Sequence, residues 1–319
     1  MPASAQYPAF SDANLRGAFF QSYEEAMTKR YIDDLIMKQD SDRAFEQYGW
    51  LGTAPVLRKW DGGRHLHTPN EFGYEIYNEE FEGTLVIPIK DINRDKTGQF
   101  QVLASGMGQR AAENPQRLFS TLLEAGESSP CFDDQYFFDT DHNEGGGVNN
   151  NDIQVDISGL PVTTHGIVSE PSDEEMEKAI LKGIKQFFTF KDDQGEPVNE
   201  NAREFKAVVP IAYLDSALAA VKNEKMTSGR QNTLVTATNF KVSVEVDPRL
   251  SWTDKFALFR TDHPVKPFIH QLETDTEFTF VNSPQNDHVF KKREYLWGVY
   301  RSEAVGYGDY KKACLVTLI

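Results

Sequence analysis

Two consecutive segments of the sequence, 72–77 and 81–89, have the composition of β-strands but cannot form a hydrophobic core by themselves. They read FGYEIY and FEGTLVIPI, rich in the aromatic and β-branched residues that favour strands, and Asn78, Glu79 and Glu80 lie between them. This pattern predicts a long two-stranded ribbon. Because an isolated ribbon is marginally stable in water, the chain must fold so that the ribbon lies on a partner surface.

Residues 1–50 show the same dependence on a partner. They are polar with scattered aromatics, and a single four-residue spacing suits one helical stripe, formed by Tyr23, Met27, Tyr31 and Leu35. We therefore expect an N-terminal arm that packs on another surface.

A long amphipathic helix is predicted in the segment that ends at 125–126. Its stripe recurs at steps of three and four, through Leu103, Met107, Ala111, Asn114, Leu118 and Leu122. Pro115 interrupts the stripe and predicts either a kink or a restart of the helix. Ser172 and Glu175 form a capping box that opens a second helix. Strands precede and follow the helices without strict alternation, so the predicted fold class is α+β.

The charge of the chain is concentrated in one block. The whole sequence has 33 Lys and Arg against 49 Asp and Glu, and the stretch 118–177 holds 14 acidic residues with no Lys or Arg. A negative chain without basic tracts argues against strong binding to a nucleic-acid backbone, because such binding requires clustered Lys and Arg. No apolar run approaches the roughly 18 residues of a membrane span, so no membrane partner is expected.

A glycine motif and a pair of histidines are the candidates for a cofactor site and a metal site. The segment 106–111, GMGQRA, matches a dinucleotide-binding loop, but the apolar stripe runs through both glycines in helical phase. Small residues that allow close packing inside a helix are the simpler interpretation. His65 and His67 alternate on one strand face without a third ligand at suitable spacing, so surface histidines are favoured.

The acidic loop that begins at Asp139 resembles the start of a calcium site. Asp139, Asp141 and Asn143 alternate as ligands would, but the turn position is Glu144 and the twelfth position is Asn150. Asp139, Asp141 and His142 are therefore weak metal candidates, and a solvated loop is preferred. Cys131 and Cys314 lie outside any CxxC motif, which favours two reduced thiols. The sequence predicts no catalytic residue, no cofactor and no enzyme activity.

Several segments, in collinear order, resemble the major head protein of Mu-type tailed phages. The similarity spans most of residues 45–319, and the string FFDTDH after a cysteine is its most specific part. The segments are YGWLG (48–52), LRKW (57–60), FEGTLVIPIKDI (81–92), LLEAG (122–126), CFDDQYFFDTDH (131–142), KPFIHQLE (266–273) and YLWGVYRSEAVGYGDYKKA (295–313). After FFDTDH this chain has Asn143 where the family often has proline.

The resemblance implies the HK97-type capsid fold. That fold has an N-terminal arm, an extended β-hairpin loop, a long spine helix, and peripheral and axial domains. Mapped onto this sequence, the expected parts are the arm at 1–50, the extended loop at 51–92, the peripheral domain with the spine helix at 93–139, the axial domain at 140–262 and the peripheral return strands at 263–319.

The resemblance also implies a function in assembly. We expect a major capsid protein that forms pentamers and hexamers and assembles into the icosahedral head of a tailed double-stranded DNA phage or prophage, inside the host cytoplasm. Its expected partners are further copies of itself, a separate scaffold or head protease, a portal and a decoration protein. It would enclose double-stranded DNA without binding a specific sequence.

Two alternatives stay open at this stage. One is an encapsulin-like compartment of the same fold that encloses protein cargo. The other, of a different class, is a metal-dependent or nucleotide-using enzyme built on the acidic loop or the glycine motif.

The expected inter-subunit contacts are apolar and aromatic residues of the extended loop. Tyr74, Ile76, Phe81 and Leu85 would contact a neighbouring copy, while Trp50, Leu57 and Trp60 form the base of the loop. Packing within one subunit is the competing interpretation for each of them. We further expect much of the acidic block, including Asp133, Asp139, Asp141 and Glu144, to face the lumen or a symmetry axis, where negative charge keeps packed DNA from adhering.

Overall fold

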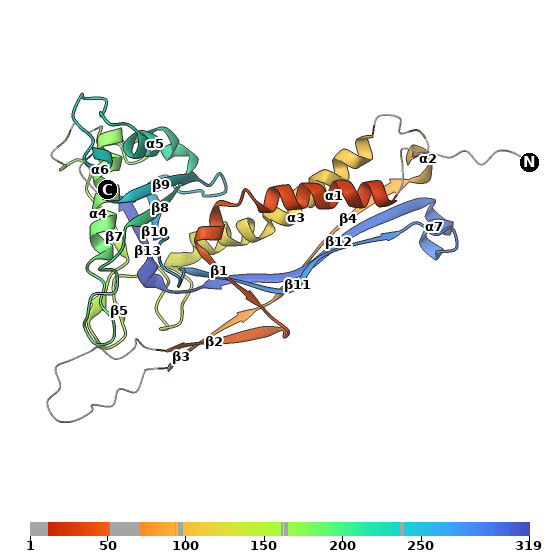
Figure 1. The fold of residues 1–319 in the computed structure, drawn as a ribbon, viewed down its shortest axis with the longest axis horizontal. Helices are drawn as coiled ribbons and strands as arrows, with labels where there is room; N and C mark the ends of the chain where they lie inside the picture. The colour runs from red at the N-terminus through yellow and green to blue at the C-terminus, as the bar shows by residue number, and fades with distance from the viewer. Residues whose placement is uncertain are drawn as a thin grey trace, which may run out of the picture.

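The computed structural model describes residues 12–51, 71–92, 94, 98–160, 162, 165–236 and 239–319. The molecule is elongated, with a bulky end that holds a five-stranded sheet and a narrow end formed by a long helix over a four-stranded sheet (Figure 1). In the described part of the chain, no helix is long and apolar enough to cross a membrane.

The narrow end is built on a sheet with the strand order β1-β11-β12-β4. Its strands are β1 (Ile36–Asp40), β4 (Glu79–Pro88), β11 (Phe268–Val281) and β12 (Glu294–Tyr307). β1 runs parallel to β11, and the other neighbours are antiparallel. The helices at this end are α1 (Asp12–Met27), α2 (Ile89–Ile92), α3 (Gln99–Glu124) and the short α7 (Asp287–Lys292) between β11 and β12, with the 3-10 turns η1 (Tyr31–Asp34) and η2 (Ala125–Glu127).

The bulky end is built on a sheet with the order β7-β13-β10-β8-β9. Its strands are β7 (Asp152–Val155), β8 (Glu204–Val209), β9 (Lys241–Val246), β10 (Lys255–Arg260) and β13 (Ala313–Leu318). The helices are α4 (Asp173–Phe187), α5 (Leu214–Lys222) and α6 (Thr233–Thr236), with the 3-10 turns η3 (Ile211–Tyr213) and η4 (Tyr310–Lys312). Two small pairs complete the fold: β2 (Phe45–Leu51) with β3 (Glu71–Tyr77), and β5 (His142–Asn143) with β6 (Val148–Asn149).

The predicted long helix is α3, and it contains both glycines of the GMGQRA segment. A side chain at Gly108 would lie 2.2 Å from the backbone oxygen of Phe19 in α1, whereas the position of Gly106 faces open space. Gly108 therefore lets α1 lie close against α3, as the packing interpretation predicted. Pro115 lies inside the helix without ending it.

The predicted pairing of the two ribbon segments is wrong. β3 pairs with β2 over its whole length, and β4 instead joins β12 at the edge of the four-stranded sheet. Only Asn78 separates β3 from β4, too short a connection for the two strands to fold back on each other. The two-stranded ribbon is thus β2–β3, and its first strand comes from the segment that was expected to be the arm.

The surface on which the described part of the N-terminal arm packs belongs to its own chain. Leu15, Phe19 and Tyr23 of α1 belong to a core cluster with α3 and the four-stranded sheet. Ile32 and Ile36 are buried in a second cluster, at the junction of the two ends. These segments therefore obtain their hydrophobic partners from their own chain.

Candidate functional site

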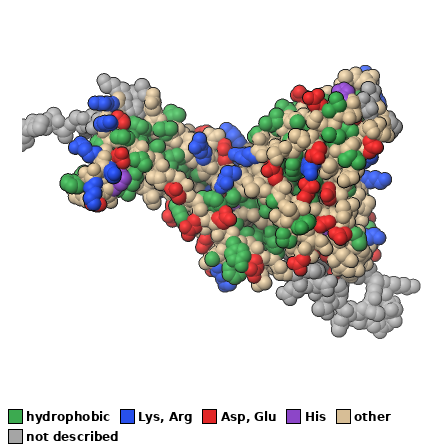
Figure 2. Space-filling view, turned by 180° about the vertical axis from the view of Figure 1, so that it is seen from behind, with side chains coloured by type: hydrophobic (Ala, Val, Ile, Leu, Met, Phe, Trp, Pro, Cys, Tyr) green, Lys and Arg blue, Asp and Glu red, His purple; other side chains and the backbone are tan. Residues whose placement is uncertain are grey.

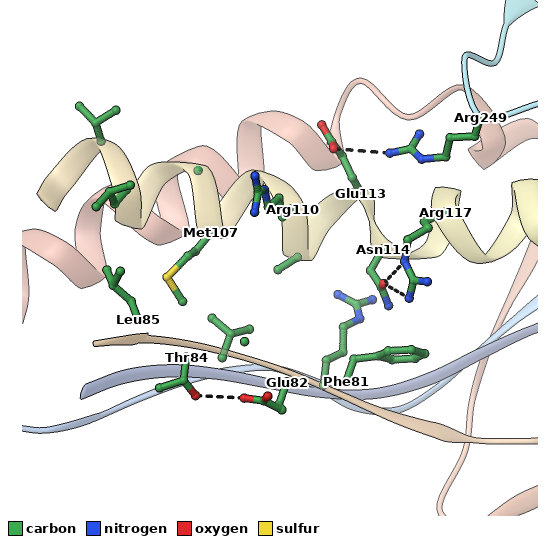
Figure 3. Close-up of a pocket in the computed structure, with 17 residues that line it drawn as sticks. Phe81, Glu82, Thr84, Leu85, Met107, Arg110, Glu113, Asn114, Arg117 and Arg249 are labelled. Carbon is green, nitrogen blue, oxygen red and sulfur yellow. Dashed lines mark hydrogen bonds and ion pairs between the residues drawn. The ribbon is translucent and has the colours of Figure 1, made fainter. Parts of the chain in front are cut away.

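A groove of about 660 Å³ runs between α3 and the edge strand β4 (Figure 3). Its floor is formed by the faces of β4 and β12 that look toward α3, and its far rim is Arg249, in the turn that follows β9. β4 is the last strand of its sheet, so among the described residues no strand pairs with the outer side of its backbone.

One half of the groove is apolar. Leu85 from β4 and Met107 from α3 point toward each other across it. Val102 and Leu103 lie beside them on α3 and are 71% and 49% exposed, respectively. Leu103 belongs to the apolar stripe predicted for this helix, and its exposure shows that the apolar surface of α3 is wider than the described part of the chain covers.

The other half carries positive charge. Arg110 and Arg117 from α3 and Arg249 line this part of the groove. Arg117 donates to Asn114 Oδ1 at 2.8 Å, and its guanidinium carbon lies 5.4 Å from the ring centroid of Phe81. Arg249 lies 3.8 Å from Glu113 at the surface.

Beneath this half, Glu303 of β12 is the centre of a buried polar network. It accepts hydrogen bonds from Asn114 of α3 at 2.7 Å and pairs with His270 of β11 at 2.6 Å and with Arg301 at 2.7 Å. Burial alone would raise the pKa of Glu303, but the hydrogen bond from His270 and the charge of Arg301 lower it. The network fixes α3 on the sheet and so sets the width of the groove.

The expected contact residues divide into three groups. Phe81 and Leu85 line the groove, and Tyr74 is half-buried with its hydroxyl at 3.4 Å from Tyr307 N. Ile76 is only 5% exposed and packs on Gly306 inside its own chain, so it is not available as a contact. Leu57, Trp60 and the side chain of Trp50 lie outside the described residues.

The structure separates His142 from the other two weak metal candidates. His142 is fully buried, its Nδ1 lies 2.7 Å from Asp133 Oδ2, and its ring stacks on Tyr310 with the centroids 3.7 Å apart. Asp141 is instead paired with Asp139 through a carboxyl–carboxyl hydrogen bond, which raises the pKa of Asp141. The predicted loop cluster is therefore not formed.

His142 instead joins a buried cluster with Cys131 and Asp133. The Cys131 thiol donates to Asp133 Oδ1 at 3.0 Å, and burial followed by the charge of Asp133 raises the pKa of that thiol well above its usual range. Ligand atoms of the three residues lie within 4.8 Å of one another. A metal bound at Nδ1 would leave His142 Nε2, which is buried and unpartnered among the described residues, without the acceptor that metal-bound histidines usually have. We interpret the cluster as a structural hydrogen-bond network.

Replacing Asp133 with asparagine is expected to lower the free energy of unfolding by about 1–3 kcal/mol, because the amide nitrogen cannot accept from the neighbouring donors. Urea unfolding followed by far-UV circular dichroism measures the change. Asp134→Asn is the matched control, since Asp134 is exposed and has a φ of 64°, a conformation that asparagine adopts readily. Equal stability of the two variants would contradict the structural interpretation.

The expectation that the acidic block faces a lumen is wrong for its buried members. Glu144 is buried in an ion pair with Lys311, and Asp133 is held by His142. The acids of the first turns of α4 are buried as well and bind the loop 227–234 or residues near the cap. Asp173 accepts from Thr227 N at 2.7 Å, Glu175 from Gly166 N at 2.8 Å and Glu177 from Thr233 N at 2.7 Å, and Glu174 and Glu177 both pair with Arg230. Much of the charge thus serves internal hydrogen bonding.

Comparisons with known proteins agree with this fold. The family described as Mu-like prophage major head subunit gpT matches residues 12–162 and 236–316, well over half of the chain. The major capsid protein of Escherichia phage Mu is 36% identical over 151 residues, 44% of this chain and 49% of that protein. The Mu-like prophage FluMu major head subunit of Haemophilus influenzae is 35% identical over 127 residues, 40% of this chain and 41% of that protein. The matched part of the chain therefore spans about half the length, or less, of each of these curated relatives.

Among solved structures, the procapsid of bacteriophage JBD30 matches with a TM-score of 0.53 and 23% identity, over 97% of this chain and 76% of that one. This similarity confirms the predicted α+β capsid fold. The family and its relatives are head and capsid subunits, which agrees with the prediction of a structural and not a catalytic chain. The match over well over half of its residues shows that the chain belongs to the Mu-like prophage major head subunit gpT family.

Proposed function

We propose that this chain is the major capsid protein of a tailed double-stranded DNA phage or prophage, and that it assembles as pentamers and hexamers into an icosahedral head. Its family, its capsid fold and its relatives support the proposal. The single observation that carries it is the groove beside α3, where Val102 and Leu103 are 71% and 49% exposed next to an edge strand. A soluble monomer rarely exposes adjacent large apolar side chains beside a cavity of this size.

The β2–β3 ribbon of a second copy is the segment that suits this groove. The ribbon exposes the aromatic pair Phe45 and Tyr77, 41% and 60% exposed and stacked at 5.1 Å. On the same face as this pair it carries Glu75, whose charge is opposite to that of the arginines in the groove. The aromatic side chains would meet the apolar half and the carboxylate the basic half. Such a head-to-tail contact between copies closes into rings when it repeats about an axis.

Among the expected contact residues, Phe81 and Leu85 remain proposed contacts, as part of the groove that receives the ribbon. Tyr74 lies on the ribbon itself and is proposed to reach the neighbouring copy with its exposed part. Trp50, Leu57 and Trp60 stay predictions from the sequence. Ile76 is not retained.

The double variant Val102→Asp and Leu103→Asp is expected to fold but to remain as single subunits. Two carboxylates in the apolar half would have to be buried without partners on assembly. Light scattering coupled to size-exclusion chromatography measures the loss of rings and shells. Val148→Asp, at a residue 65% exposed in β6 and far from the groove, is the control and should assemble. Normal particles from the double variant would contradict the role of the groove.

The remaining parts of the proposal concern partners and location. The subunit would be assembled in the host cytoplasm with a separate scaffold or head protease, a portal and a decoration protein, and would end in the virion capsid. It would enclose double-stranded DNA without reading its sequence and would need no cofactor. Purified native particles are expected to contain DNA, and particles that contain only protein cargo would favour a compartment shell instead.

A further inference from the structure

The four-stranded sheet has one face that the described part of the chain leaves largely open. Along β12, the odd-numbered residues such as Trp297 and Glu303 face α1 and α3, so the even-numbered residues face the opposite side. The chain's own ribbon covers only one end of that side, where Ile76 packs on Gly306. Ser302 is buried on this side, but between Tyr300 and the tip the side chains are half-buried or exposed, and no described strand pairs over this part of the face.

Cross-strand pairs divide this open face into three rows. The row nearest the tip is apolar, the middle row is small and neutral, and the third row is acidic. The rows are Val281, Leu296 and Val86; then Thr279, Gly298 and Thr84; then Glu277, Tyr300 and Glu82. Val86 is 48% exposed, and Figure 3 shows Thr84 and Glu82 on the side of β4 away from α3.

The acidic row belongs to a wider negative surface. The pKa of the Tyr300 hydroxyl is raised, first by partial desolvation and then by the negative charge of the nearby Glu80 and Glu273. Glu80, Glu82, Glu273 and Glu277 are all exposed. In Figure 2, acidic side chains gather along the lower edge of the middle part of the molecule.

The tip of the same sheet has the opposite charge. It is formed by α7 and carries Phe290, which is 79% exposed, followed by Lys291, Lys292 and Arg293, all exposed. Lys291 is paired with Asp287 at 2.8 Å. Figure 2 shows Lys and Arg side chains at this narrow end.

The order along the face is therefore basic, apolar, acidic, with the apolar row near the middle. At roughly 3.3 Å per residue, Arg293 lies about 10 Å to one side of Leu296 and Tyr300 about 13 Å to the other. A second copy turned by half a turn about an axis at the apolar row would place its basic tip on the acidic row of the first copy, and the reverse. The apolar rows would then meet each other at the axis.

We propose that this open face is a two-fold contact between two copies of the chain, with Val86 and Leu296 at the axis and Lys292 and Arg293 of each copy on Glu82 and Glu277 of the other. The contact rests on the proposed function, since it would join neighbouring subunits of the shell. In a two-fold contact the same patch of each copy meets the other, so the patch must be complementary to itself. A patch with basic residues on one side of the apolar row and acidic residues on the other is complementary to itself. The β2–β3 ribbon of another copy is a poorer occupant of this face, because Glu75 beside its exposed aromatic pair would face like charges.

A single cysteine at the axis tests the symmetry directly. In Val86→Cys, the introduced thiol of one copy would lie opposite the same thiol of its partner, so mild oxidation of assembled particles should convert most of the protein into covalent dimers on a non-reducing gel. Cys131 and Cys314 are buried and give little background. Tyr136→Cys, at a residue 48% exposed outside this face, is the control and should stay monomeric. Equal dimer yields from the two variants would overturn the proposal.

A charge exchange tests the pairing of the tip with the acidic row. Lys292→Glu with Arg293→Glu should abolish shells, as should Glu82→Lys with Glu277→Lys, and the four changes together should restore them. The control combines the two tip changes with Glu200→Lys and Glu224→Lys. It has the same net charge as the fourfold exchange but does not restore opposite charges at the contact, so it should not assemble. Thermal unfolding of each variant confirms that it folds.

The outcomes separate this inference from the function on which it rests. Shells from the unaltered chain, with no rescue by the fourfold exchange, would overturn the two-fold contact and leave the capsid function standing. An unaltered chain that forms no particle under any condition would overturn the proposed function itself.

Discussion

Glu303→Gln is expected to lower the free energy of unfolding of the subunit by about 3–5 kcal/mol, the usual effect of removing one partner from a buried ion pair. Glu303 has no exposed surface, and it receives hydrogen bonds or charge from Asn114, His270 and Arg301. Glutamine has the same shape but leaves the buried guanidinium of Arg301 without its counter-charge. The measurement is urea unfolding of the dilute subunit.

Glu79→Gln is the matched control, because Glu79 is an exposed carboxylate on β4, which pairs with β12 at this position. Its effect should stay within about 0.5 kcal/mol, as for most surface changes. A similarly small effect for Glu303→Gln would contradict the view that the network holds α3 on the sheet.

The lowered pKa of Glu303 predicts part of the acid sensitivity of the subunit. Its folded-state pKa is lowered relative to the unfolded value, so its contribution to stability is present above the unfolded pKa and is lost as the pH falls through the folded one. With an unfolded value near 4.3, the loss occurs at and below about pH 4. The Glu303→Gln variant should therefore show a shallower fall in stability between about pH 5 and 3 than the unaltered chain.

Gly108→Ala is expected to have the second large effect, a loss of about 1–3 kcal/mol, the range found for overpacking a well-packed interior. The added methyl group would lie 2.2 Å from Phe19 O and 3.2 Å from Tyr23 N, both backbone atoms of α1. Backbone cannot rotate away as a side chain can, so α1 must shift on α3. The loss would appear in thermal unfolding and in faster hydrogen exchange of the α1 amides.

Gly106→Ala, two residues earlier in α3, gives the opposite expectation. Nothing lies within 4 Å of its added methyl group, so the higher helix propensity of alanine should stabilise the subunit by about 0.5–1 kcal/mol. If both glycine changes were neutral, the close helix contact would be refuted. Neither change should alter binding to nucleotides, because both glycines lie inside α3 and not in a phosphate-binding loop.

The sequence predicted those elements whose signals are local. The stripe from Leu103 to Leu122 and the capping box at Ser172 each lie within a few helical turns, and both helices are present. The partner of β3 could not be predicted in this way. The choice between β2 and β4 depends on the one-residue connection at Asn78 and on β12, more than 200 positions away, which competes for β4.

The candidate site was predicted only in part, because some of its residues have local signals and others depend on long-range packing. Phe81 and Leu85 were recognisable as apolar residues of a strand, and they line the groove. The exposure of Val102 and Leu103 could not be predicted, because both are ordinary helix residues until the positions of α1 and the sheet are known. Spacing along the chain groups His142 with Asp139 and Asp141, whereas its bond to Asp133 depends on the turn that brings Pro130 next to Tyr136.

Electron microscopy of the purified chain tests the central claim most directly. The account predicts closed shells, or rings with five-fold and six-fold symmetry, in which the β2–β3 ribbon of one copy lies in the groove beside α3 of the next. A protein that stays a monodisperse monomer at high concentration, with and without co-expressed head proteins, would contradict it.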